Sequence, residues 1–189
     1  MKTLTINSQD LGDAATIDTY QTFTGDQTDE NLISYYNEEH NTDYDYDDFE
    51  WDYDHAQIVK DFAERRAEFL ESESPAIHKC VPVSTGSPKE YNFSTDYAMF
   101  EITYDDDLVE KFIKENQEGY DEFYRSSGWY SHTEWRDDDD EQKGENIEMS
   151  KLDYYLNKTI DHDTAYYAVA EHEYEIYENN TTMKLKKKQ

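Results

Sequence analysis

The densest group of chemically capable side chains lies in residues 43–54, where seven carboxylates and five aromatic rings share twelve positions. Carboxylates recur there at almost every second residue, beginning with Asp43, Asp45 and Asp47. In an extended strand, side chains at positions i and i+2 lie on one face, about 6.5–7 Å apart. Phosphates follow one another at a similar spacing along a nucleic-acid strand, and duplex DNA carries one charge per about 1.7 Å of axis. We therefore interpret residues 43–54, called the acidic run below, as an array that imitates a phosphate backbone.

Two other interpretations of the acidic run stay open. Asp43, Asp45 and Asp47 match positions one, three and five of an EF-hand calcium loop, but Asp48 replaces the required glycine and Asp54 replaces the bidentate glutamate. We therefore predict no metal site and no cofactor. The run can also be a solvated acidic edge without function, because a phosphate decoy and such an edge differ only in their three-dimensional spacing.

A second acidic set lies near the C-terminus, where Glu171, Glu173 and Glu175 alternate with Ala170, His172, Tyr174 and Ile176. Residues 164–178 can be read as a helix or as a strand, and the alternation favours a strand. Such a strand would place the three glutamates on one face and extend the array. The predicted partner-binding residues are Asp43, Asp45, Asp47, Asp48, Glu50, Asp52, Asp54, Glu171, Glu173 and Glu175.

No comparable pattern points to catalysis. The six histidines are scattered, and His172-Glu173 begins like a zinc-protease helix but lacks the second histidine. The chain has neither a glycine-rich phosphate loop nor a Gly-x-Ser-x-Gly elbow. Its one cysteine, Cys80, lies in an apolar segment and is expected to be a small buried hydrophobe. We predict a protein that is not an enzyme and has no catalytic residues.

Net charge narrows the class of partner. The 189-residue chain has 46 Asp and Glu against 17 Lys and Arg, a formal charge of −29, and four of the lysines lie in residues 184–188. Phosphate binding needs a positive footprint, so direct binding to nucleic acid is excluded. Docking on an anionic membrane surface is excluded for the same reason. The expected partner is a basic protein.

The elements that position these residues are predicted from periodicity. Aromatic residues make up 15% of the chain, which favours a folded domain with a tyrosine-rich core over a disordered acidic chain. Gly119 is expected to interrupt a helix, and residues 137–144 are expected to be an exposed loop. The fold class is α+β, a small antiparallel sheet with several packed helices. Helices are predicted over residues 31–40, 55–71 and 145–160 and after residues 105–107, and strands over residues 3–6, 17–23, 76–83 and 91–104.

The predicted organisation is a single acidic domain over residues 1–178 and a polar, basic tail over residues 179–189. The first residues lack the apolar core of a signal peptide, and no segment approaches the 18 apolar residues of a membrane span, so a cytoplasmic location is expected. The oligomeric state is left open, with a homodimer among the compatible states. The residues expected to be buried are Trp51, Val59, Phe62, Phe100, Ile102, Leu108, Val109, Phe112 and Ile113.

In composition and charge pattern over the whole chain, this small, acidic, tyrosine-rich sequence resembles the DNA-mimic anti-restriction and anti-CRISPR proteins of phages and mobile elements. The resemblance implies a protein of an infected or host bacterial cell that binds a basic, DNA-acting defence nuclease and blocks its access to DNA. Two alternatives are an acidic assembly protein that docks a basic partner and a Ca²⁺-binding acidic module. The lysines of residues 184–188 depart from a pure mimic and leave open a second contact, including one within the chain.

Overall fold

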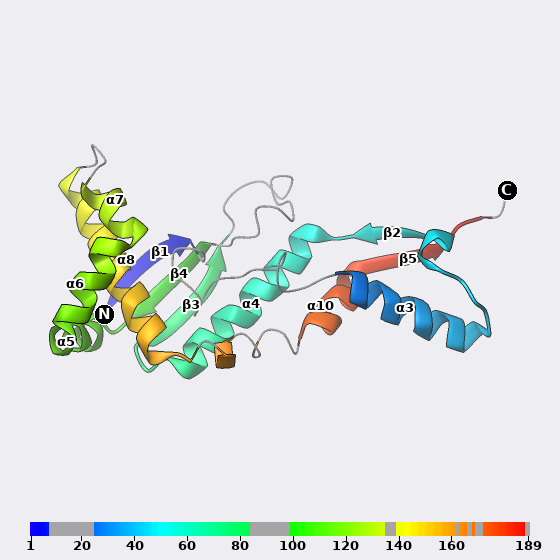
Figure 1. Cartoon of the computed structure of the whole chain (residues 1–189), viewed down its shortest axis with the longest axis horizontal. Coiled ribbons are helices and arrows are strands. Elements are labelled where there is room, and N and C mark those ends of the chain that lie inside the picture. The colour runs from blue at the N-terminus through cyan, green and yellow to red at the C-terminus, as the bar shows by residue number, and fades with distance from the viewer. Residues whose placement is uncertain are drawn as a thin grey trace.

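The computed structural model describes residues 1–7, 25–83, 99–134, 139–161, 163–165, 168 and 172–187. Within these residues the chain forms an elongated α+β molecule, which confirms the predicted fold class (Figure 1). A three-stranded sheet with its helices lies at one end, and a two-stranded ribbon lies at the other. The long helix α4 (His55–Glu73) runs between them. The strand predicted over residues 17–23 lies outside the described residues.

The three-stranded sheet is antiparallel and has the order β1-β4-β3. Its strands are β1 (Lys2–Asn7), β3 (Ile77–Val83) and β4 (Met99–Tyr104). In the register of β1 and β4, Ile6 lies opposite Phe100, and both side chains are buried. Exposed and buried positions alternate along β1, as the sequence pattern predicts, so one face of the sheet is covered and the other meets solvent.

Helix α4 covers part of this face, because it packs against β3 and carries a continuous apolar stripe. The Asp54 side chain begins the helix by accepting a hydrogen bond from the backbone N–H of Gln57, at 3.1 Å. The helix predicted over residues 55–71 is therefore confirmed and ends two residues later. The buried residues of α4 include Ile58, Val59, Phe62, Ala63, Phe69 and Leu70.

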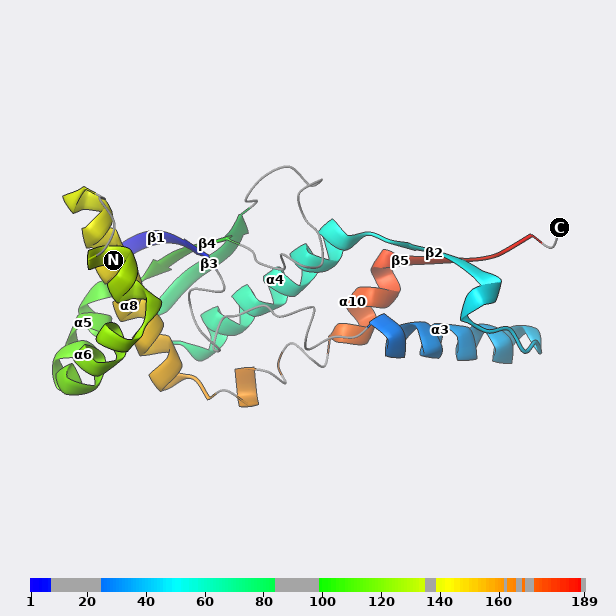
Figure 2. The same cartoon turned by 45° about the horizontal axis from the view of Figure 1, so that its top comes forward.

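Four further helices pack together at the sheet end, as Figure 2 shows from a second direction: α5 (Asp106–Glu115), α6 (Gln117–Ser126), α7 (Gly128–Glu134) and α8 (Asp140–Thr159). Helix α8 contacts β1 and the other three helices. It begins five residues earlier than predicted, because the Asp139 carboxylate accepts the backbone N–H of Gln142 at 2.9 Å. Residues 140–144 are therefore helical, so the prediction of an exposed loop there is wrong.

Gly119 does not interrupt a helix, contrary to expectation. It lies inside α6, and the break between α5 and α6 is at Asn116. A Cβ atom at position 119 would overlap the hydroxyl of Tyr154 on α8. Glycine is therefore used here for the close approach of two helices.

The predicted burial holds for the strand and α4 residues but not for every aromatic position. Val59, Phe62, Phe100 and Ile102 are at most 1% exposed. On α5, Val109 and Ile113 are buried, Phe112 is half-buried and Leu108 is 36% exposed. Trp51 is also only half-buried. The stripe on α5 is thus narrower than predicted.

The other end of the molecule is built from α3 (Gly25–His40), α10 (Glu173–Asn180) and an antiparallel ribbon of β2 (Phe49–Tyr53) and β5 (Thr181–Leu185). The strand favoured over residues 164–178 is wrong where the structure describes it, because residues 173–178 are helical. Within the predicted tail, residues 179–180 complete α10 and residues 181–185 form β5. One buried cluster extends from Leu4 to Tyr177 and links α10 to the core beside α4.

Candidate partner-binding surface

The acidic run is not one strand. Residues 46–48 form a short 3₁₀ helix, η2 (Tyr46–Asp48), and only residues 49–53 belong to β2. Asp45 and Asp48 form a capping box. The Asp45 carboxylate accepts a hydrogen bond from the backbone N–H of Asp47 at 2.9 Å, and the Asp48 carboxylate accepts one from the backbone N–H of Asp45 at 3.0 Å. The phosphate-like spacing expected along the whole run therefore applies only to Glu50 and Asp52, which are exposed on one face of β2.

The carboxylates of the run divide into two kinds. Those of Asp45, Asp48 and Asp54 cap η2 and α4, so they hold the backbone in place. The other four are exposed and cap no helix, whereas Asp45 and Asp54 are exposed but bound to the backbone. These four residues, called the outward acids below, are Asp43, Asp47, Glu50 and Asp52.

Asn37 on α3 holds the loop that leads into the run. Its Oδ1 accepts hydrogen bonds from the backbone N–H of Tyr44 and from the hydroxyl of Thr42, both at 2.9 Å, and its Nδ2 donates to the Tyr44 carbonyl at 2.8 Å. Asn41, which lies between Asn37 and Thr42 in the sequence, has a φ of 50°. This is a left-handed conformation that asparagine tolerates better than most residues. No sequence pattern marked Asn37, because its partners are contacts across a turn.

Aromatic rings pack along the face of β2 that is opposite Glu50 and Asp52. Phe49 is 2% exposed and packs edge-on against Tyr36 of α3 and Tyr44, with ring centroids 5.2 and 5.9 Å apart. Trp51 stacks between Tyr46 and Tyr53, at 5.1 and 6.3 Å. These contacts are aromatic pairs of ordinary geometry, and they hold the strand that presents Glu50 and Asp52.

A short hydrogen bond also ties β2 to α3. The Tyr53 hydroxyl donates to Oδ2 of Asp29, a carboxylate that is 4% exposed, at 2.5 Å. Burial, followed by the hydrogen bond to Asp29, raises the pKa of Tyr53 well above its usual range. Tyr53 therefore stays protonated and keeps donating to Asp29 at any physiological pH.

The charge of this end is strongly one-sided. Residues 25–54 contain twelve Asp and Glu and no Lys or Arg. The lysines that approach them come from β5 and the residue after it. Lys184 lies opposite Glu50 in the ribbon, and Lys186 donates its backbone N–H to the Asp48 carbonyl at 2.8 Å and its Nζ to the Asp47 carbonyl at 2.6 Å.

The second acidic set does not form the predicted ladder. Glu171 lies outside the described residues, Glu173 begins α10, and Glu175 is exposed on the same helix, 3.8 Å from the His172 ring. In a helix, residues two apart point in nearly opposite directions. Acids at every second position therefore form no ladder on one face of a helix, although α10 lies at the same end of the molecule as the acidic run (Figure 1).

A network of ion pairs at the sheet end was missed by sequence reasoning. Lys2 of β1 and Lys151 of α8 meet Glu148, at 2.9 and 3.4 Å, and Lys151 also contacts Glu110 of α5 at 2.5 Å. Burial alone would raise the pKa of Glu148, but the two lysines outweigh it and hold that pKa below its ordinary value. The network joins three elements, which identifies it as structural.

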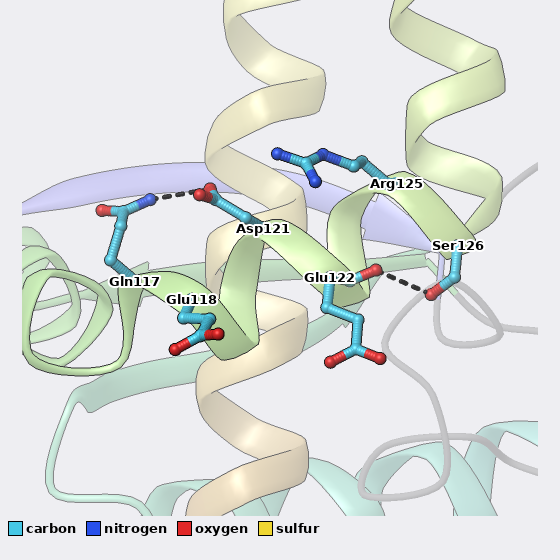
Figure 3. A pocket seen from close by; sticks show the side chains of 6 residues that line it. All are labelled: Gln117, Glu118, Asp121, Glu122, Arg125 and Ser126. Atoms are coloured by element: carbon cyan, nitrogen blue, oxygen red, sulfur yellow. Dashed lines mark hydrogen bonds between the residues drawn. The ribbon is translucent and has the colours of Figure 1, made fainter.

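A hollow lies along α6. It is lined by residues of this one helix, and in Figure 3 the carboxylates of Glu118 and Glu122 point away from the Arg125 guanidinium. Gln117 donates to Asp121 at 2.8 Å, a pairing within the helix surface. Exposed side chains of a single helix do not place a nucleophile beside a base.

Cys80 and the potential metal ligands are the other groups that could carry chemistry. Cys80 is buried, as predicted, and burial, followed by the nearby Glu71 carboxylate, raises the pKa of its thiol to about 12. Across the described ranges, no three His, Cys, Asp or Glu side chains are grouped to hold a metal ion. The described part of the chain also has no helix long and apolar enough to span a bilayer.

Comparison of the chain with protein-family models, with curated proteins and with solved structures finds no match. The candidate surface is therefore defined by its own residues: the four outward acids, held by Asn37, the three capping carboxylates and the rings of β2.

Proposed function

We propose that this protein is an acidic DNA mimic that occupies the DNA-binding groove of a basic, DNA-acting protein and so excludes DNA. A host defence nuclease, of the restriction or CRISPR type, is the expected target. The observation that supports this most is the ribbon end of the molecule, where twelve acidic residues in residues 25–54 have no Lys or Arg among them. The four outward acids among them are exposed on a braced frame.

The frame matters because fixed charges compete better than mobile ones. A disordered acidic chain loses conformational entropy when it binds, whereas a braced one has already lost it on folding. The caps at Asp45 and Asp48, the Asn37 contacts and the stacked rings supply this bracing. The ribbon end also lies far from the sheet end along the molecule (Figure 1), so a groove can receive it without meeting the three-stranded sheet.

The test is competition with DNA. A labelled duplex is bound to a purified restriction nuclease or CRISPR effector, and increasing amounts of this protein are added at several salt concentrations. The mimic is expected to displace the duplex, with a potency that falls steeply as salt rises. The variant Asp43→Asn, Asp47→Asn, Glu50→Gln, Asp52→Asn spares the capping carboxylates and is expected to lose about tenfold in potency.

A matched control removes four exposed charges from the sheet end instead: Glu101→Gln, Glu115→Gln, Glu118→Gln and Glu122→Gln. Its potency is expected to change by less than about twofold. Equal losses in the two variants, or no displacement from any nuclease tested, would overturn the proposal. Turnover of a bound partner, or abolition of activity by one Asp→Asn change in a folded protein, would indicate an enzyme.

A further inference from the structure

Strand β5 is a basic strand paired with an acidic one. Its sequence Thr181-Thr182-Met183-Lys184-Leu185 alternates, and Lys184 stands opposite Glu50 while Met183 stands opposite Trp51. Lys186 continues the pairing beyond the strand, through the carbonyl groups of Asp47 and Asp48. The acidic run therefore already binds an extended, lysine-rich segment, which is part of this chain.

The two strands are anchored very differently. β2 carries Phe49, which is 2% exposed, and Tyr53, which bonds to the buried Asp29. In β5 no side chain is buried: Thr181 and Met183 are half-buried, and Leu185 is 39% exposed. A two-stranded ribbon is marginal by itself, so β5 depends on its pairing with β2 and on the Lys186 contacts that follow it. It therefore lies at the low end of local stability.

We propose that the edge of β2 is a docking site for an extended, lysine-rich segment of a partner protein, and that β5 is its exchangeable resident. The partner's backbone would replace the ladder that β5 makes, and alternate side chains would give specificity. A lysine would face Glu50 and an apolar residue would face Trp51, as Lys184 and Met183 do. The inference rests on the proposed function for the basic character of the partner, and it adds how that partner is held.

Exchange would also change the surface charge. While β5 is in place, Lys184 and Lys186 lie among the outward acids; when it leaves, those acids face the partner alone. A tethered strand competes at an effective concentration of about 1 mM. Strand β5 therefore prevents weakly binding basic segments from occupying the edge of β2. Only a segment that matches the ladder and the alternation would displace it.

The probe is a fluorescent peptide with the sequence of residues 181–189, and binding to the full chain is followed by anisotropy. The variant Lys184→Glu, Lys186→Glu places like charges opposite Glu50 and weakens the resident strand. It is expected to bind the peptide at least about tenfold more tightly than the unmodified chain. The matched control Lys111→Glu, Lys114→Glu adds the same charge at exposed positions of α5 and is expected to bind like the unmodified chain.

A second variant locks the resident in place. Asp52 and Thr182 are directly opposite in the ribbon, at a separation that a disulfide can span. The variant Asp52→Cys, Thr182→Cys is expected to bind the peptide when reduced and to lose that binding when oxidised. The native Cys80 is buried and does not compete.

Three results would overturn the inference: equal binding by the two double-glutamate variants, equal binding by the oxidised and reduced lock, or equal binding of a scrambled peptide of the same composition. Each would mean that net charge alone attracts the peptide. Failure here is distinguishable from failure of the proposed function, because the DNA-competition assay uses variants outside β5.

Discussion

At the scale of single residues, the candidate surface depends on side chains that are not themselves part of it. Asn37 contributes three hydrogen bonds to the loop before the acidic run, and Asp45 and Asp48 close the turn into β2. Asn37 is neutral, and each cap uses one carboxylate oxygen, so these residues act on the surface mainly by positioning the outward acids.

Replacing Asn37 by alanine is expected to lower the free energy of unfolding by about 1–2 kcal/mol, since the backbone groups of Tyr44 lose their partner in a half-buried place. Urea denaturation measures this loss. Ser34→Ala, at an exposed position of the same helix, is the control and should change little. An unchanged midpoint for Asn37→Ala would show that the loop is held by other contacts.

Glu148 is expected to make stability depend on acid pH. Its pKa is lowered in the folded state, so its contribution is present above the unfolded value of about 4.3 and is lost as the pH falls through the folded value. Glu148→Gln should therefore be less stable than the unmodified chain at pH 6, with a difference that shrinks towards pH 3. Exposed Glu145→Gln is the control; a difference independent of pH would contradict the ion-pair account.

At the scale of elements, two glycines that lie in helices differ in packing although their helix propensity is the same. Gly119 lies against Tyr154, whose ring is surrounded by Phe112, Tyr120 and Phe123, whereas Gly144 on α8 has no atom near the position of a Cβ. Intrinsic propensity alone would favour alanine at both positions. The surroundings decide the sign of the effect.

Gly119→Ala is expected to destabilise the protein by about 1–3 kcal/mol, because α6 and α8 must move apart. Gly144→Ala is expected to stabilise it by about 0.5–1 kcal/mol. Thermal and urea unfolding of the two variants, side by side, test both signs. Stabilisation by Gly119→Ala would mean that the Tyr154 ring yields without cost.

At the scale of the whole molecule, charge repulsion sets the conditions under which the protein is stable. A net charge of −29 on one elongated chain is expected to make the melting temperature rise with salt. Screening shortens the reach of each charge from about 30 Å at 10 mM to about 8 Å at 150 mM.

The measurement is a melting series from 10 to 300 mM NaCl, repeated with KCl to separate screening from binding of one cation. A flat or falling melting temperature would show that the acids are already paired. A rise seen with only one of the two salts would point to specific ion binding instead.

Much of the fold was predictable because its patterns are local. The alternation of β1 and β4, the stripe of α4 and the acidic start of α5 each reflect a period that one element imposes on its own residues. The strand predicted over residues 164–178 rested on alternation near Glu171, Glu173 and Glu175. However, Ile176 and Tyr177, which are adjacent in sequence, are both buried on a helix. Alternation over a few residues does not distinguish a short helix from a strand when tertiary contacts choose the buried face.

The sequence by itself determined the acidic character of the molecule, its α+β class and the residues of its main core, because composition and period are properties of the chain alone. The tertiary structure decided which acids cap a helix and which do not, since capping by Asp45, Asp48 and Asp54 depends on where η2 and α4 begin. It also decided that the lysines beyond residue 183 lie beside the acidic run. That pairing joins segments more than 120 positions apart. A contact between such distant segments produces no periodic pattern in the sequence of either strand, so it cannot be predicted from that pattern.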